Sequence, residues 1–308
     1  MATASGHTAA SDGPAPLLAS GVVPFFALLF GAAALAYGGI FVRQSELPPT
    51  ASAVYRVAFA VPFLFTCGLT QRARAPRVTR SEWWRGRARL LAVGVIFSGN
   101  LALYHWSIAL TTLANSALLA NLAPLFVVLG AWLVFGKRIS GPFALSLAVA
   151  LTGAVMLIGA RADLGATHIL GGVLGMATAV FYGAYLLAVN RVRARFDTVT
   201  VMAWSSIGTF FVLLPVALAL GESVVPRTGH GVLILLALAL ISHVGGQGAI
   251  AYALAHLPAT VSSVTLLVQP VMAAAFGWMA FQEYPRPVEL VGGAVVLIGI
   301  VMARRSPQ

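Results

Sequence analysis

Two histidines are the side chains best suited to acid–base chemistry in this 308-residue sequence, because they lie inside long apolar runs. His105 and His243 are the only residues in the middle of those runs that titrate near neutral pH. The eight acidic residues all lie in the N-terminal tail, near the ends of runs or in the breaks between them. A relay of buried carboxylates is therefore not expected, and any proton coupling would have to use the two histidines.

One arginine, Arg56, also lies within an apolar run. It is about five residues from one end of that run, or roughly 7–8 Å along a helix that rises 1.5 Å per residue. Two interpretations are open. The guanidinium either extends back toward water or loop carbonyls, or it binds an anion or takes part in gating.

Two other apolar runs combine polar and aromatic side chains at helical spacing. Asn100 and Tyr104 are four residues apart and share a helix face, and so do His243 and Gln247. Further candidates in these runs are His105, Trp106 and Tyr252. The glycines beside His243 either let a ligand approach the backbone or only permit tight helix packing.

Amides and aromatic rings complete the set of candidates. Asn121 and Gln269 precede Pro124 and Pro270 at related positions, where an amide could bond a carbonyl freed by the proline or a polar group of a ligand. Four aromatic residues are also candidates: Tyr37, Tyr182, Tyr185 and Trp204. Their rings would line a cavity if they turn inward, and would otherwise serve packing. A site of this kind carries little charge and suits a zwitterionic or neutral solute.

The elements that must position these residues are membrane helices. Hydrophobic residues make up 59% of the chain and charged residues only 9%, whereas a soluble domain averages roughly 25% charged residues. About ten apolar runs are long enough to span a bilayer as helices. The single cysteine, Cys67, excludes an intramolecular disulfide and a multi-cysteine metal site, and no metal or cofactor is predicted.

Charge in the breaks predicts the orientation. Breaks rich in Lys and Arg stay on the cytoplasmic side, and most of the 19 basic residues fall in alternate breaks. The other breaks hold only Arg43, Arg161, Arg227 and Arg286. Both termini are therefore predicted to be cytoplasmic in a bacterial inner membrane, with a disordered tail over residues 1–19.

An internal repeat divides the chain into halves at 20–162 and 163–308. A shift of 146 residues superposes Trp132 on Trp278 and Gly153 on Gly299, among other matches. Five spans in each half is an odd number, so the second half enters the membrane from the opposite side. Inverted repeats are common in carriers that expose a midplane site alternately to the two sides.

The repeat also resembles a known family. The stretch LAPLFVVLGAWLVFGKRISGPFALSLAVALTGAVMLIG and its echo VQPVMAAAFGWMAFQEYPRPVELVGGAVVLIGIVMA are similar to the two EamA repeats of the drug/metabolite transporter superfamily. SAVYRVAFAVPF and ALTTLANSALLANLAP resemble the second and fourth helices of the first repeat. The family has Glu where Lys137 stands, whereas Glu283 keeps the pattern.

This resemblance implies an all-α membrane fold of ten helices, arranged as two inverted five-helix repeats around a central cavity. It also implies export of small metabolites, with amino-acid export of the YddG type as the first expectation. The alternatives are export of other solutes or drugs, a channel, or a flippase for lipid-linked substrates. An enzyme is not expected, because HExxH, GxSxG and paired carboxylates within a helix are all missing. The expected partners are a small molecule and the bilayer, and monomer and homodimer both remain open.

Overall fold

The computed structural model describes residues 17–71, 80–135, 140–160, 165–193, 195–257, 265–266 and 268–305. Residues 1–16 of the expected tail, and the basic residues of 72–79 and 136–139, lie outside this part. The described helices are α1 (Leu17–Gln44), α2 (Pro49–Gln71), α3 (Arg80–Leu110), α4 (Leu113–Ala120), α5 (Ala123–Phe135), α6 (Gly141–Gly159), α7 (Ala166–Arg193), α8 (Thr198–Ala219), α9 (Gly229–Ala237), the π-helix η3 (Leu238–Gln247), α10 (Gly248–His256), α12 (Val268–Phe281) and α13 (Pro287–Arg305).

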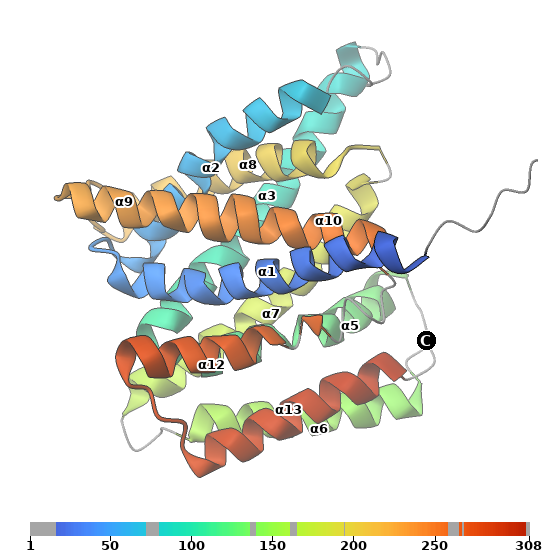
Figure 1. The fold of residues 1–308 in the computed structure, drawn as a ribbon, viewed down its shortest axis with the longest axis vertical. Helices are drawn as coiled ribbons and strands as arrows, with labels where there is room; N and C mark the ends of the chain where they lie inside the picture. Colours follow the sequence, from blue (N-terminus) through green and yellow to red (C-terminus); the bar gives the residue numbers. More distant parts are fainter. Residues whose placement is uncertain are drawn as a thin grey trace, which may run out of the picture.

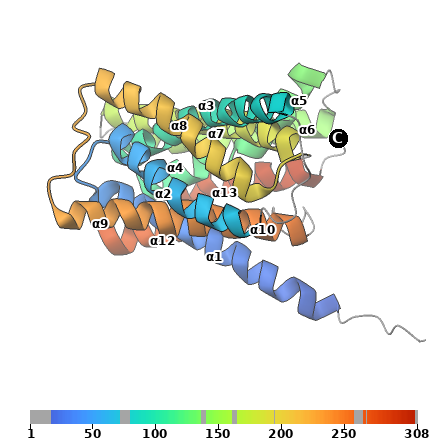
Figure 2. The same cartoon turned by 90° about the horizontal axis from the view of Figure 1, so that it is seen from above.

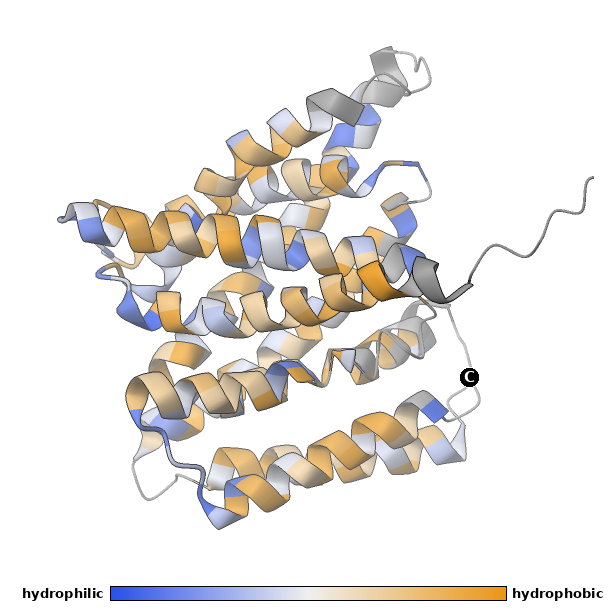
Figure 3. Ribbon diagram, in the orientation of Figure 1, coloured by the Kyte–Doolittle hydropathy of each residue, from blue (hydrophilic) through white to orange (hydrophobic). Residues whose placement is uncertain are grey.

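These helices form a membrane bundle. Among the residues that the structure describes, seven helical segments are long and apolar enough to cross a bilayer. Three shorter apolar helices accompany them, at Leu113–Val127, Val268–Phe281 and Pro287–Ala303. Apolar residues dominate the shafts, and hydrophilic residues gather toward the helix ends (Figure 3). This is the distribution that a hydrocarbon solvent imposes, because each helix bonds its own backbone groups. The chain is therefore a multi-pass membrane protein.

Two of the expected spans are interrupted. The apolar run that begins at Leu113 divides into α4 and α5 around Asn121 and Leu122. The run that begins near Gly231 consists of α9, the ten-residue π-helix η3 and α10, which follow one another as a single rod (Figure 1). π-Helical turns are rare and occur frequently at functional sites. Two of the candidate residues, His243 and Gln247, lie in this segment.

The helices pack in a pattern that is nearly unchanged when the halves are exchanged. α3 packs on α7 and α8, and η3 packs correspondingly on α1 and α2. The pair α6 and α13 lies side by side at one edge of the bundle (Figures 1 and 2). The repeat-related glycines Gly153 and Gly299 both lie in this pair, where an added Cβ would come within 2.6 Å of backbone nitrogen of the opposite helix. Only glycine permits this approach.

Candidate functional site

Arg56 lies at the centre of a buried polar cluster. It is on α2, and only 4% of its surface is exposed. Its Nη1 is 3.5 Å from Nε2 of His105 on α3, and its Nε has no hydrogen-bond partner. Within the described part of the chain, no carboxylate forms an ion pair with this guanidinium. A buried cation without a counter-ion is costly, so the position is typical of a site that receives an anion.

The hydrogen bonds of Ser52 determine which tautomer His105 adopts. Ser52 lies one turn before Arg56 on α2, and its hydroxyl donates to the carbonyl of Pro49 at 2.8 Å. The same oxygen is 2.9 Å from Nδ1 of His105, and it must therefore accept that bond. His105 then carries its proton on Nδ1 and presents the Nε2 lone pair to Arg56. The serine therefore orients the ring so that this nitrogen faces the arginine.

His243 lies on the π-helix η3, in the second half of the chain. It is 2% exposed, and its Nε2 is 3.0 Å from the hydroxyl of Ser206 on α8. Its Nδ1 and the hydroxyl of the adjacent Ser242 are buried without partners. Buried polar groups are nearly always paired, so Nδ1 of His243 and Nε of Arg56 leave hydrogen-bonding capacity inside the bundle. The Ser242 hydroxyl lies instead against Gly38 of α1.

Aromatic rings line this polar centre. Tyr182 and Tyr185 of α7 are stacked with ring centroids 6.0 Å apart, and Phe97 of α3 lies 4.6 Å from Tyr185 and 5.9 Å from His243. Tyr104 adjoins His105 on α3 and, like Tyr182, is half-buried. We call six of the predicted residues the central cluster: Arg56, Tyr104, His105, Tyr182, Tyr185 and His243. They come from α2, α3, α7 and η3, and so from both halves.

Four further candidates lie on α3, at the end of α4 and on α12. The Asn100 amide donates to the Thr178 carbonyl at 3.4 Å, and the Trp106 indole donates to the Thr50 hydroxyl at 3.0 Å. The Asn121 amide donates to the carbonyl of Ala117 at 2.8 Å, one turn back. This bond ends α4, and it does not use the carbonyl that Pro124 would free. The backbone nitrogen of Gln269 bonds Leu266, and its side chain is half-buried.

The remaining candidates lie apart from the central cluster. Tyr37 is 40% exposed and packs on Phe41 and Phe276, while Tyr252 is 45% exposed and packs on His256. Trp204 is half-buried and contacts Phe65, with the Arg87 guanidinium 4.5 Å from its ring centre. Gln247, at the end of η3, is half-buried.

Three serines of the site were not among the predicted residues. Ser52 had a signal in the sequence, because it lies four residues before Arg56 and therefore on the same helix face. Ser242 adjoins a predicted histidine. Ser206 had no signal, since its contact with His243 joins residues 37 apart across two helices.

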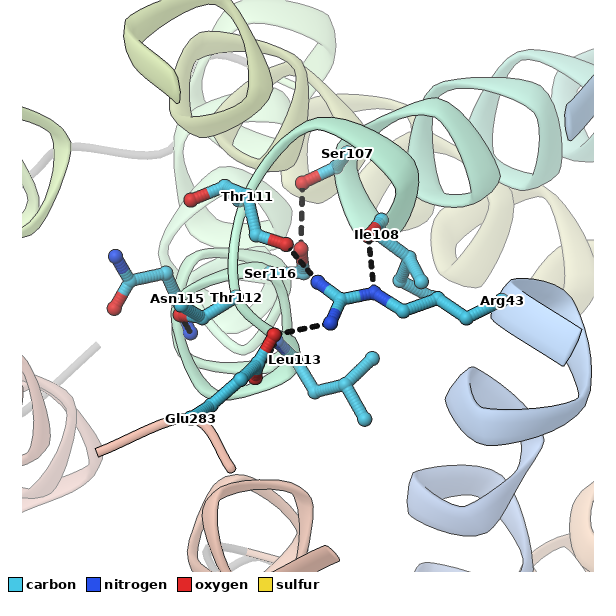
Figure 4. Close-up of polar contacts among 9 residues, drawn as sticks. All are labelled: Arg43, Ser107, Ile108, Thr111, Thr112, Leu113, Asn115, Ser116 and Glu283. Atoms are coloured by element: carbon cyan, nitrogen blue, oxygen red, sulfur yellow. Dashed lines mark hydrogen bonds and ion pairs between the residues drawn. The ribbon is translucent and has the colours of Figure 1, made fainter. Parts of the chain in front are cut away.

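One end of the bundle is sealed by charged groups that join distant segments. Arg43, at the end of α1, forms an ion pair with Glu283 and bonds the carbonyls of Ile108 and Thr111 (Figure 4). The other carboxylate oxygen of Glu283 accepts from the backbone nitrogen of Leu113 at 3.0 Å. The bonds span up to 240 residues of sequence and tie α1, α3 and α4 to the segment after α12.

Two more carboxylates act at the same end by capping backbone N–H groups. Glu222 accepts from Thr50 and Ala51 at the start of α2. Glu46 accepts from Thr228 at 3.1 Å and from Arg227 at 2.7 Å. These backbone bonds, that of Thr228 foremost, hold the pKa of the Glu46 carboxyl below its ordinary value. The loops at this end are therefore fixed to one another.

Known proteins share this fold and sequence pattern. Residues 22–159 and 169–305 each match the EamA-like transporter family. The pseudopaline exporter CntI of Pseudomonas aeruginosa is 27% identical over 224 residues, covering 73% of this chain and 77% of that protein. An uncharacterized transporter of Archaeoglobus fulgidus is 27% identical over 290 residues, covering 89% and 96%.

Two further comparisons agree. A protein of Streptantibioticus cattleyicolor named as a probable terminal-alkyne amino-acid exporter is 30% identical over 206 residues, covering 66% of this chain and 68% of that protein. A solved crystal structure superposes with a TM-score of 0.58 at 22% identity, covering 94% of this chain and 100% of that one, which supports the fold alone. The chain belongs to the EamA-like transporter family, and it is a membrane transporter and not an enzyme.

Proposed function

We propose that this transporter exports amino acids, and that Arg56 binds the substrate carboxylate. The observation that carries the proposal is the burial of Arg56 with no acidic partner among the described residues and with an unpartnered Nε. A carboxylate would supply the missing counter-charge through charge-assisted hydrogen bonds. Two relatives named as exporters, one of them for an amino acid, support the same substrate class.

The rest of the central cluster suits the remainder of such a substrate. The unpartnered Nδ1 of His243 can bond an α-amino group or another polar group. The rings of Tyr182, Tyr185 and Phe97 offer an apolar wall for a side chain. We propose the eight other predicted residues as parts of the pathway that leads to this point: Tyr37, Asn100, Trp106, Asn121, Trp204, Gln247, Tyr252 and Gln269.

The architecture supports an alternating-access cycle. We propose ten spans, in which the three shorter apolar helices also cross the membrane, with inverted halves at 20–162 and 163–308. Both termini are then cytoplasmic, and the end sealed by Arg43 and Glu283 faces outward from a bacterial inner membrane. In this proposal the structure is closed on its outer side. The exchange symmetry of the packed helix pairs supports this arrangement.

Export of other small solutes or drugs remains the alternative, together with a flippase for lipid-linked substrates. A flippase would need the central site to open laterally to lipid. The cavity between α4, α12 and α13 is lined by no residue of the central cluster. Transport of a lipid-linked substrate by reconstituted protein would favour the flippase.

Transport into proteoliposomes tests the proposal. Purified protein would be reconstituted and supplied with radiolabelled amino acids, including aromatic and branched ones, with protein-free vesicles as the control. Saturable uptake of at least one of them is expected. The absence of uptake across the panel would reject amino acids as the substrate class.

A further inference from the structure

A cavity of about 310 Å³ lies between α4, α12 and α13. Its volume is at the lower end of the roughly 300–1,000 Å³ that is typical of ligand pockets. It shares no lining residue with the central cluster. The cavity is therefore separate from the proposed substrate site.

One end of this cavity is polar and offers mainly hydrogen-bond acceptors. Asn115, Glu283 and Glu289 line it there. Asn115 is 2% exposed and donates to Glu289 at 3.0 Å, but its own Oδ1 has no partner. Glu289 is 5% exposed, and its second oxygen accepts from the backbone nitrogen of Arg286 at 2.8 Å. Each carboxylate oxygen can accept more than one bond, so this end can receive an additional donor.

The rest of the cavity is apolar and extends away from the helix ends. Glu289 is in the first turn of α13, and Leu297, which also lines the cavity, is eight residues further on. At 1.5 Å per residue this is about 12 Å along the helix. Val271 and Leu290 line the cavity and are 58% and 61% exposed. The cavity therefore opens on a surface that faces hydrocarbon, with its polar end at the depth of the membrane interface.

We propose that this cavity binds a membrane lipid with a primary ammonium head group, with one acyl chain lying between α12 and α13. The ammonium donates to Oδ1 of Asn115 and to the carboxylate of Glu289, whose charge is complementary to its own. Glu283 lines the same end but is paired with Arg43. The polar end of the cavity would hold the head group, and its apolar part would hold the acyl chain, as a lipid is oriented in the bilayer. A quaternary ammonium has no N–H group and cannot make these bonds, so the site discriminates between head groups of equal charge.

Native mass spectrometry of the full chain released from bilayers tests this site. The bilayers would hold equal amounts of phosphatidylethanolamine, phosphatidylcholine and phosphatidylglycerol. We expect roughly tenfold more retained phosphatidylethanolamine than phosphatidylcholine, as one charge-assisted hydrogen bond would give. Ala294→Phe, which fills the cavity from an exposed lining position, should abolish the preference. Ile298→Phe, one turn along α13 and also exposed, is the matched control and should keep it.

A second variant separates head-group recognition from simple filling of the cavity. Glu289→Gln should lower the preference severalfold, while Glu222→Gln, which alters a backbone cap elsewhere at the same end, should leave it unchanged. Equal retention of the three lipids by the wild type would overturn the proposal. An unchanged preference in Ala294→Phe would also overturn it. The same holds if the wild type retains a soluble alkylamine but no phosphatidylethanolamine. Because Arg56 takes no part, loss of transport in Arg56 variants would leave this result unaffected.

Discussion

Nη1 of Arg56 lies 3.5 Å from Nε2 of His105, and Ser52 orients that histidine from the opposite side at 2.9 Å. The three residues join α2 to α3 within the first half. They leave one guanidinium nitrogen without a partner in the interior of a membrane protein. This relationship underlies the proposed carboxylate site.

Replacing Arg56 with Gln should raise the apparent KM for an amino acid about ten- to a hundredfold, the effect of losing a hydrogen bond worth about 1.5–3 kcal/mol to a charged group. Uptake by proteoliposomes over a range of concentrations measures this. Arg195→Gln removes the same charge at an exposed position and is the control. Equal KM values for the two variants would contradict the role of Arg56.

Replacing His243 with Ala should reduce transport substantially, because it removes the unpartnered Nδ1 and leaves Ser206 without its partner. Gln247→Ala, at the end of the same π-helix, is expected to have a smaller effect. His230→Ala alters an exposed histidine and serves as the control. If transport is unchanged in both the His243 and Gln247 variants, the π-helix does not line the pathway.

Glu283→Gln should loosen the sealed end of the bundle, because it removes the charge that holds Arg43. The measurement is the rate at which a membrane-impermeant maleimide labels a cysteine introduced at the fully buried Ser116. The background carries Cys67→Ser, since the native cysteine is exposed. Labelling should be faster than in Tyr284→Phe, a change in the same segment. Equal rates would show that the ion pair does not control access.

Glu46 should make the stability of the protein depend on pH in the acid range. Its pKa is lowered in the folded state by the backbone N–H groups of Thr228 and Arg227. The stabilisation is therefore complete above the pKa of the unfolded state and is lost as the pH falls through the lower folded value. Thermal unfolding should show Glu46→Gln less stable than the wild type at pH 7 and equal to it once the wild-type carboxyl is protonated. A constant difference at every pH would rule out this origin.

Gly153→Ala should destabilise the protein by about 1–3 kcal/mol through overpacking, since its Cβ would lie 2.6 Å from the backbone nitrogen of Val296. Gly159→Ala, on the same helix with nothing within 4 Å of the added atom, should be neutral or slightly stabilising. Thermal unfolding in one detergent compares the two. A Gly153 variant as stable as the Gly159 variant would mean that α6 and α13 are not in close contact.

The sequence predicted the membrane class and the family because both depend on patterns that extend along the chain. Apolar runs of membrane length predict helices whatever their neighbours. The resemblance to EamA repeats is confirmed by matches over 22–159 and 169–305. The count of ten spans and their orientation remain predictions, since seven helices meet the length and hydropathy of a span and three are shorter.

The candidate site was less accessible to sequence reasoning. His105 and Arg56 stood out because polar groups are rare in apolar runs, but two interpretations of Arg56 were left open. Its proximity to His105 depends on how α2 packs against α3. The π-helix likewise depends on packing, since an added Cβ at Gly38 of α1 would lie 2.4 Å from the Ser242 hydroxyl. The bonds of Glu46 and Glu222 to loops more than 170 residues away have no local signature.

Arg56 is proposed to bind the carboxylate of a transported amino acid. The most direct measurement compares uptake of an amino acid and of its carboxamide by wild-type and Arg56→Gln proteoliposomes. The wild type should transport the acid far better than the amide. The variant should lose this preference, mainly because it takes up the acid more slowly than the wild type does. A wild type that transports acid and amide equally, or a variant that retains the wild-type preference, would contradict the account.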